Sequence, residues 1–168
     1  MTEALKAELF KEAKRIEEDS VHSCKGNFHA ARRWEGCHFW IGASIAILAG
    51  VTGVSAFNNE SSFAGAIAFI IAGLTAANTF LDPKGISERH QSAGVNYNGL
   101  RNKTRIFYNI EIPSQVDMVV LKKILSEINE ERDTLNKNSP KIPNWAYQKA
   151  KESINNGEAD YEVDRADE

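Results

Sequence analysis

FWIGASIAILAGVTGVSAF at residues 39–57 and FAGAIAFIIAGLTAANTFL at residues 63–81 are the two stretches that decide the fold. Each has nineteen residues, and the only formal charge between Glu35 and Asp82 is that of Glu60. A helix of this length rises about 28 Å, close to the roughly 30 Å hydrocarbon core of a bilayer. The core helix of a soluble protein normally keeps a polar face, and these stretches have no charged face. They therefore predict two transmembrane helices.

Whole-chain averages conceal this apolar block. The chain has 168 residues, of which 26% are charged, with a formal net charge of -3 and a mean hydropathy of -0.39. These values are ordinary for a soluble domain. The charged residues, however, are concentrated in residues 1–35 and 82–168. A soluble alternative would wrap the apolar pair on every side with other helices, and too few residues remain for that.

The basic residues predict the orientation in the membrane. The connection NNESS, residues 58–62, has neither Lys nor Arg, whereas both outer flanks are basic. By the positive-inside rule, residues 58–62 form an external loop and both termini of this multi-pass protein are cytoplasmic. The 38 residues before the first span are too long and too rich in both charge signs for a signal peptide. The flanking basic residues are Lys25, Arg32, Arg33, Lys84, Arg89, Arg101, Lys103 and Arg105.

The charged regions on either side of the spans also have helical periodicity. Apolar side chains recur every three or four positions in residues 1–38, which predicts an N-terminal cytoplasmic helix. Residues 82–157 predict a cytoplasmic helical region, and residues 158–168 form an acidic tail. No segment has the alternation of a strand. The expected fold is all-α: a two-helix transmembrane hairpin with a helical cytoplasmic bundle formed by the N-terminal helix and the helices after the hairpin.

Local signals predict where the helices after the second span begin and end. Proline restarts or stops helices, side-chain caps begin them, and glycine ends them. The expected boundaries are Asp82-Pro83, the break IEIPSQVD at residues 110–117 with Ser114 and Asp117 as a capping-box-like start, NKNSP at residues 136–140, Pro143 and Gly157.

One face of the helix after Pro83 has a heptad-like pattern, which we call the seam. Its members alternate at spacings of four and three, so we expect this helix to pack on partners. The seam begins only a few residues after the second span, and this makes His90, Tyr97 and Leu100 candidates for a gate. The seam residues are Ile86, His90, Ala93, Tyr97, Leu100, Thr104 and Phe107.

Small residues recur every four positions in both spans, and we call these rows the small-residue ridges. Such ridges let helices approach closely in lipid, and a pore would need several copies because two helices enclose no water path. We therefore expect a homo-oligomer. The alternative is that these residues hold the hairpin together or cap backbone carbonyls. The packing or pore candidates are Gly42, Ala46 and Gly50 in the first span, Ala64, Ala68, Ala72 and Ala76 in the second, and the polar group Thr75, Asn78 and Thr79.

No catalytic signature is present in the sequence. It has no P-loop, no G-x-S-x-G, no G-x-G-x-x-G and no H-E-x-x-H, so we expect no enzyme, no catalytic residue and no cofactor. The histidines and cysteines have neither a C-x-x-C spacing nor a His pair at i, i+4, so no metal site is expected. Direct binding to nucleic acid is not expected either. The residues whose side chains could bind a metal by type are His22, Cys24, His29, Cys37 and His38.

The tail EADYEVDRADE has six acidic residues and one basic residue. Without it, the other 157 residues have 19 basic and 17 acidic groups, so the body of the chain is close to neutral. Tails of this composition are usually solvated ends. The alternative is a docking peptide that uses Tyr161 and Val163.

Three stretches resemble the SLATT domain, the SMODS and SLOG-associating two-transmembrane effector. They are ARRWEGCHFW before the first span, FLDPKGISERHQSAGVNYNGLRNKTR after the second, and SPKIPNWAYQKAKESINNGEADYEVD near the end. In the family's pattern a histidine follows the second span and an aromatic residue follows one heptad later, and His90 and Tyr97 fit. The matching proline pairs and closing helix are Ser139-Pro140, Ile142-Pro143 and Ala146-Tyr147.

The resemblance implies a bacterial inner-membrane effector of antiviral defence. SLATT proteins are associated with nucleotide-second-messenger synthetases, nucleotide sensors or reverse transcriptases, and are proposed to be pore-forming in abortive infection. The implied trigger is a cytoplasmic sensor protein or a nucleotide second messenger. Two alternatives stay open: a membrane-anchored adaptor that recruits a cytoplasmic partner, and a holin-like lesion former. The long region after the second span argues against the lesion former, and the small-residue ridges favour the effector over the adaptor.

Overall fold

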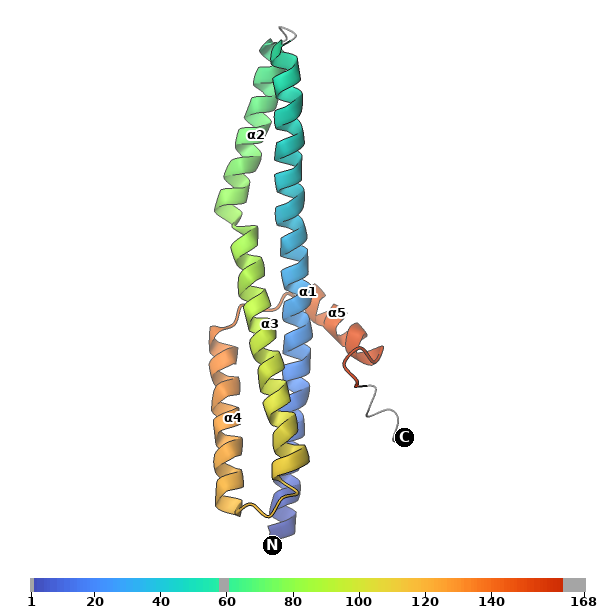
Figure 1. Cartoon of the computed structure of the whole chain (residues 1–168), viewed down its shortest axis with the longest axis vertical. Helices are drawn as coiled ribbons and strands as arrows, with labels where there is room; N and C mark the ends of the chain where they lie inside the picture. The colour runs from blue at the N-terminus through green and yellow to red at the C-terminus, as the bar shows by residue number, and fades with distance from the viewer. Residues whose placement is uncertain (1, 58–60, 162–168) are drawn as a thin grey trace. The chain divides into compact units, whose positions relative to one another are not determined.

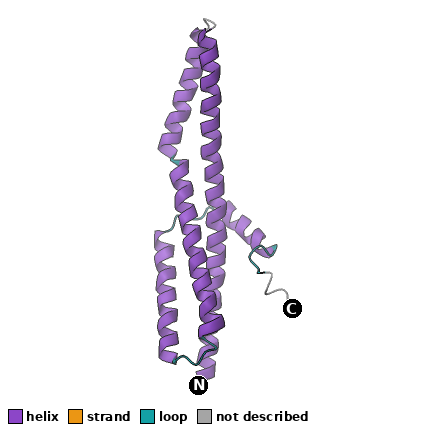
Figure 2. Cartoon of the chain, viewed as in Figure 1, coloured by secondary structure: helices purple, strands orange, loops and turns teal. Residues whose placement is uncertain are grey.

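The computed structural model describes residues 2–57 and 61–161, and within these ranges the chain is all-helical, with no strand (Figure 2). The prediction of an all-α fold with two long apolar helices is therefore confirmed. Residues 58–60 of the expected external loop and 162–168 of the acidic tail lie outside the described residues. In chain order the elements are α1 (Thr2–Phe57), α2 (Ser61–Leu81), α3 (Pro83–Ile106), the π-helical turn η1 (Phe107–Glu111), α4 (Met118–Asn138) and α5 (Asn144–Asn155) (Figure 1).

Helix α1 joins two elements that the sequence suggested separately. It continues without interruption past residue 38, so the N-terminal helix and the first apolar stretch are a single helix of 56 residues. Gly26 does not break it, although glycine is a weak helix former. A Cβ atom on Gly26 would lie 2.9 Å from a side-chain carbon of Ile142. The glycine therefore permits the close approach of the chain that leads into α5.

Helices α2 and α3 are separated by one residue at the expected place. Asp82 has a φ of 43°, and Pro83 is the first residue of α3, a position at which proline loses no hydrogen bond. The carboxylate of Asp82 accepts a hydrogen bond from the backbone N–H of Gly85 at 3.0 Å. This side-chain cap satisfies one of the free donors at the start of α3.

The later boundaries follow the predicted signals, with one difference. Asp117 is the N-cap of α4 and accepts a hydrogen bond from the N–H of Val119 at 2.8 Å. Ser114, expected to share in that cap, instead donates to the carbonyl of Glu111 at the end of η1. Pro143 precedes α5, and Gly157 follows it with a φ of 77°.

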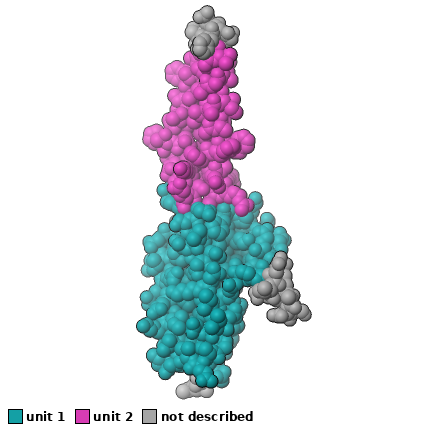
Figure 3. Space-filling view, in the orientation of Figure 1, with its two compact units in different colours: residues 1–30, 89–168 teal, residues 31–88 magenta. Residues whose placement is uncertain are grey.

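The chain divides into two compact units (Figure 3). The first contains residues 1–30 and 89–168, which we call the helical body. Its core joins Ile16 of α1 to Leu100 of α3 and Leu121 of α4, none of which is exposed to solvent. Helix α4 lies along α3 (Figure 1), and Lys103 and Glu131 form an ion pair between them at 2.8 Å.

The second unit contains residues 31–88, which we call the apolar unit. It includes the second half of α1, all of α2 and the first turns of α3 (Figure 1). The hydroxyl of Ser87 donates to the carbonyl of Ala31 at 2.9 Å and joins the two chain ends of this unit.

Candidate functional site

The apolar unit has almost no interior. None of residues 32–54 in α1 is buried, and Ile67 is the only buried residue between positions 62 and 82. Even large aromatic residues of this unit are exposed: Phe69 is 84% exposed and Phe80 is 89% exposed. The described residues thus include two helices that are long and apolar enough to cross a membrane. Water is a poor solvent for such a continuous apolar surface, whereas lipid is a good one.

One narrow stripe of each apolar helix is partly shielded inside the unit. The shielded positions recur at spacings of three and four, as expected for two helices that pack along one another. The residues on these stripes are Ile41, Ile45, Leu48, Thr52 and Ser55 in α1, and Ala64, Ile67, Ile71, Leu74 and Asn78 in α2; Ala43 and Ala77 beside them are also partly shielded.

The small-residue ridges lie on other faces. Gly42, Ala46 and Gly50 are exposed, and a Cβ atom added at either glycine would meet nothing within 4 Å. In α2, Ala68, Ala72 and Ala76 are exposed, and only Ala64 is partly shielded. Apart from Ala64, the ridges therefore do not hold α1 and α2 together. They are open to a further helix.

The polar candidates in α2 have different surroundings. The hydroxyl of Thr79 donates to the carbonyl of Thr75 at 2.9 Å. This is the carbonyl-capping role that was the alternative to a role in packing or in a pore. Thr75 is exposed. The side-chain oxygen of Asn78 is buried and has no hydrogen-bond partner among the described residues. The side-chain oxygen of Asn78 is thus a hydrogen-bond acceptor without a donor among the described residues.

In the helical body, the seam of α3 is buried as its spacing predicts. All its members from His90 to Phe107 are buried, and Leu100 is not exposed to solvent at all. The hydroxyl of Tyr97 donates to the side-chain oxygen of Asn136 at 2.8 Å, which connects the seam to α4. The three gate candidates His90, Tyr97 and Leu100 therefore share one packed face.

His90 forms a buried polar pair with Asn27 of α1. The Nδ1 atom of His90 lies 2.8 Å from Oδ1 of Asn27, and both residues are buried. The amide nitrogen of Asn27 donates to the carbonyl of Ser23 at 2.9 Å, so its oxygen is the atom that faces His90. The oxygen can only accept, which assigns the proton of the neutral imidazole to Nδ1. Burial, and secondarily the nearby charge of Arg89, lowers the pKa of His90.

Sequence reasoning identified His90 and Tyr97 but not their partners. Asn27 and Asn136 are ordinary polar residues by sequence, and Asn136 lies in a stretch expected only to end a helix. A signal was available for Asn27. The stripe of α1 that starts with Ile16 continues through Ser20, Cys24 and Asn27, and all of these are buried. A polar residue on an otherwise apolar stripe indicates a buried hydrogen-bonded pair.

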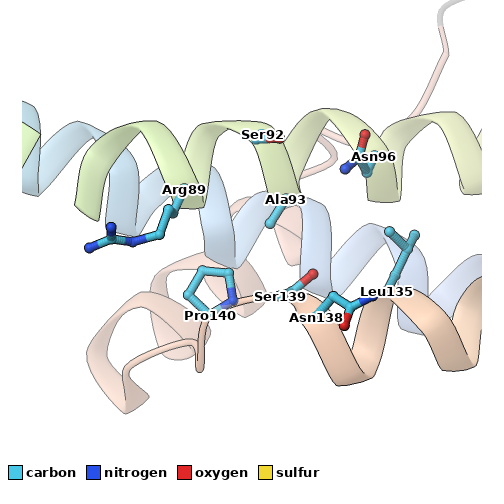
Figure 4. A pocket seen from close by; sticks show the side chains of 8 residues that line it. All are labelled: Arg89, Ser92, Ala93, Asn96, Leu135, Asn138, Ser139 and Pro140. Carbon is cyan, nitrogen blue, oxygen red and sulfur yellow. The ribbon is translucent and has the colours of Figure 1, made fainter. Parts of the chain in front are cut away.

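A pocket of about 340 Å³ lies beside the seam. Figure 4 shows α3 on one side of it and the end of α4 with the following connection on the other. Ala93 belongs both to the seam and to the pocket lining. The other lining residues are Arg89, Ser92, Asn96, Leu135, Asn138, Ser139 and Pro140.

The histidines and cysteines weighed for a metal are dispersed. His22 stacks on Tyr147 with ring centroids 5.8 Å apart, and His29 lies 3.3 Å from the hydroxyl of Ser153. Burial raises the pKa of the Cys24 thiol, and neither cysteine forms a disulfide. Within residues 2–57 and 61–161, no group of three His, Cys, Asp or Glu residues is arranged to hold a metal ion.

The chain was also compared with known proteins. No family model matches it, and no curated protein or solved structure is significantly similar to it.

Proposed function

We propose that the chain is a membrane effector that oligomerises and forms a pore, or disrupts the membrane, when a cytoplasmic signal or partner acts on its helical body. One observation carries this proposal. The apolar unit has two uncharged helical stretches, buries almost none of their surface, and turns its small-residue ridges outward.

Lipid solvates such a unit well. Each helix satisfies its own backbone hydrogen bonds, so its residues can leave water without leaving polar groups unpaired. The exposed rings of Phe39 and Trp40, whose centroids lie 5.4 Å apart, begin the first stretch, and aromatic rings favour the headgroup level. We propose that residues 39–57 and 63–81 form a transmembrane hairpin with both termini in the cytoplasm.

The ridges support self-association. Helices associate in lipid through small residues that allow close backbone contact. Because Gly42, Gly50 and Ala68 are open to a further helix, a second copy of the chain is the partner that they fit. Several copies together would bring enough helices to surround a water path.

The resemblance to the SLATT family supplies the biological setting of the proposal. From this resemblance we propose that the effector acts in the bacterial inner membrane, in antiphage defence, with a sensor protein or nucleotide second messenger as trigger. In this scheme the seam of α3 transmits the signal, because α3 contributes residues to both the helical body and the apolar unit. The proposal assigns no chemical reaction to the chain.

Leakage of a dye from liposomes of phosphatidylethanolamine and phosphatidylglycerol tests the proposal. The trigger is absent from this assay, so we expect little leakage by the full chain at low protein-to-lipid ratios. At high ratios mass action favours the oligomer without a trigger, and leakage should then rise steeply with the ratio, as an oligomeric pore requires. Replacing both Ala68 and Ala72 with Leu should reduce leakage about tenfold, because the added bulk separates the associating backbones. The matched pair is Ala68→Leu alone and the control Ala66→Leu, which adds the same bulk at an exposed position off the ridge and should leak like the wild type. Equal leakage by the ridge and control variants would contradict association through this ridge.

A membrane-anchored adaptor is the second candidate, and the surface of the helical body favours it. Val119 and Ile110 of this body are 74% and 60% exposed, and these apolar residues are available to a cytoplasmic partner. Absence of leakage at every protein density, with the chain fully inserted, would favour the adaptor over the effector.

A further inference from the structure

The chain that follows α5 turns back toward α1 and α3. The N–H of Glu158 donates to the carbonyl of Ser153 at 3.1 Å, and that of Gly157 donates to the carbonyl of Ile154 at 2.9 Å. This is the hydrogen-bond pattern of a Schellman motif, and it requires the positive φ that Gly157 adopts. The turn directs residues 157–161, GEADY, toward α1 and α3. We call this segment the strap.

Three basic side chains from α1 and α3 contact the strap, and we call them the basic patch. Lys25 lies 3.3 Å from the carboxylate of Glu158, and the guanidinium of Arg101 donates to the carbonyl of Ala159 at 2.6 Å. The ring of Tyr161 lies beside two guanidinium groups, with its centroid 5.0 Å from the Cζ atom of Arg101 and 4.2 Å from that of Arg105. The strap is therefore recognised by its charge, its backbone and its aromatic ring.

Arg101, the central residue of the basic patch, also approaches an acidic residue of α1. Only 15% of the Arg101 side chain is exposed, and its Nε atom lies 3.9 Å from the carboxylate of Glu17. Glu17 in turn accepts a hydrogen bond from Tyr108 at 2.9 Å and pairs with Lys14 at 3.3 Å. Although burial opposes it, the hydrogen bond to Tyr108 and the charge of Glu17 raise the pKa of Lys14. The Nε atom of Arg101 has no hydrogen-bond partner among the described residues, so Glu17 provides it with a nearby negative charge and not with a hydrogen bond.

The contacts made by the side chains of Glu158 and Tyr161 are weak. Hydrogen bonds from Ser153 and Lys25 lower the pKa of Glu158, but this carboxylate is exposed and water screens its ion pair. Cation–π contacts at an exposed surface are also weak one by one. The strongest single contact of the strap is therefore the part-buried hydrogen bond from Arg101 to the carbonyl of Ala159, to which these exposed contacts add.

We propose that residues 157–161 are a releasable strap that fastens α5 to α1 and α3, and that Lys25, Arg101 and Arg105 form a docking surface for an acidic segment with an aromatic residue. In this structure the chain's own strap occupies that surface. A partner with such a segment would compete for the same surface and free α5. This inference stands independently of the membrane activity proposed above.

Hydrogen exchange of the full chain in detergent micelles tests the strap. Replacing Tyr161 with Ala removes the ring, and exchange of the α5 amides should become roughly three- to tenfold faster. Tyr161→Phe is the control, because it keeps the ring and should leave exchange as in the wild type. Exchange within α4 should be unchanged in both variants, which shows that the body stays folded. Unchanged α5 exchange in Tyr161→Ala, or equal acceleration by both variants, would overturn the proposal.

A labelled peptide tests the docking surface directly. The probe is a synthetic peptide with the sequence of residues 157–168, added to the full chain with Tyr161→Ala, whose own strap lacks the ring. We expect its fluorescence anisotropy to rise on binding, and the affinity to fall as salt increases from about 0.1 M to about 1 M and shortens the Debye length. Adding Arg105→Gln to this full-length Tyr161→Ala chain should weaken peptide binding severalfold, whereas Arg105→Lys should retain part of it. Failure of the peptide to bind, or equal binding to the Arg105→Gln chain, would contradict the proposal.

Discussion

At the scale of single residues, the buried pair of His90 and Asn27 is the most constrained polar contact in the helical body. Both side chains are buried, and their hydrogen bond joins residues 63 positions apart in the sequence. A buried imidazole is tolerated here because the oxygen of Asn27 accepts a hydrogen bond from its N–H and the carbonyl of Ser23 accepts one from the amide of Asn27. A charged His90 would carry a proton on both ring nitrogens, and burial disfavours this charged form.

We predict that this pair makes the stability of the helical body depend on pH. Burial lowers the pKa of His90 below its ordinary value of 6.5, so the unfolded chain takes up the proton first. The free energy of unfolding should therefore be highest above pH 6.5 and fall as the pH drops from there toward the lower pKa of the folded state. The charge of Arg89 on the same helix acts in the same direction.

Denaturant unfolding of the full chain in detergent micelles, followed by circular dichroism between about pH 7 and about pH 5, measures this effect. The variant His90→Gln has no titrating group at this position and should show a smaller decline over that range. The other three histidines are present in both proteins and cancel in the comparison. Parallel declines in the two proteins would show that His90 does not contribute.

At the scale of elements, α3 connects the parts of the helical body. Its seam residues alternate at spacings of four and three, and those from His90 onward are buried. The seam contacts α1 through the bond of His90 to Asn27 and α4 through the bond of Tyr97 to Asn136. Close packing brings Phe28 of α1 to α3, where a Cβ atom on Gly94 would lie 2.7 Å from its ring.

We predict that Tyr97 has separable packing and hydrogen-bonding roles. Tyr97→Phe removes only the bond to Asn136, an exposed residue that water can rehydrate, and should cost about 1 kcal/mol of unfolding free energy. Tyr97→Ala also leaves a cavity and should cost about 3–5 kcal/mol. Denaturant unfolding in micelles measures both values.

The same two variants test whether the seam is a gate, as proposed. The Ala variant should then be inserted but unresponsive to its trigger, or should leak without it, whereas the Phe variant should retain the wild-type response. An Ala variant that is less stable and yet leaks like the wild type would limit the seam to structural packing.

At the scale of the whole molecule, the uneven distribution of charge is the dominant property. The apolar stretches have no charge, the outer flanks are basic, and residues 58–62 have no basic residue. In a bilayer these features favour one orientation, since positively charged flanks stay in the cytoplasm.

We predict that a reporter active only outside the cytoplasm will work when inserted at Asn59 and fail when fused to either terminus. Alkaline phosphatase is a suitable reporter because it needs an oxidising compartment to form its disulfides. A cytoplasmic reporter at the same three positions is the control and should give the opposite result. Phosphatase activity at either terminus would refute the orientation assigned from the basic residues.

The sequence by itself determined the helical elements of this protein, most of their boundaries and the buried face of α3. These features depend on neighbours within a few positions: Asp82 and Pro83 separate two helices, Asp117 caps a third, and the spacing of the seam specifies which face is buried. Only the tertiary structure decided that the small-residue ridges face outward, that Asn27 is the partner of His90, and that Tyr161 lies beside Arg101 and Arg105. These last two contacts join residues 56 to 63 positions apart, and helical periodicity contains no information about which distant residue will meet a given face.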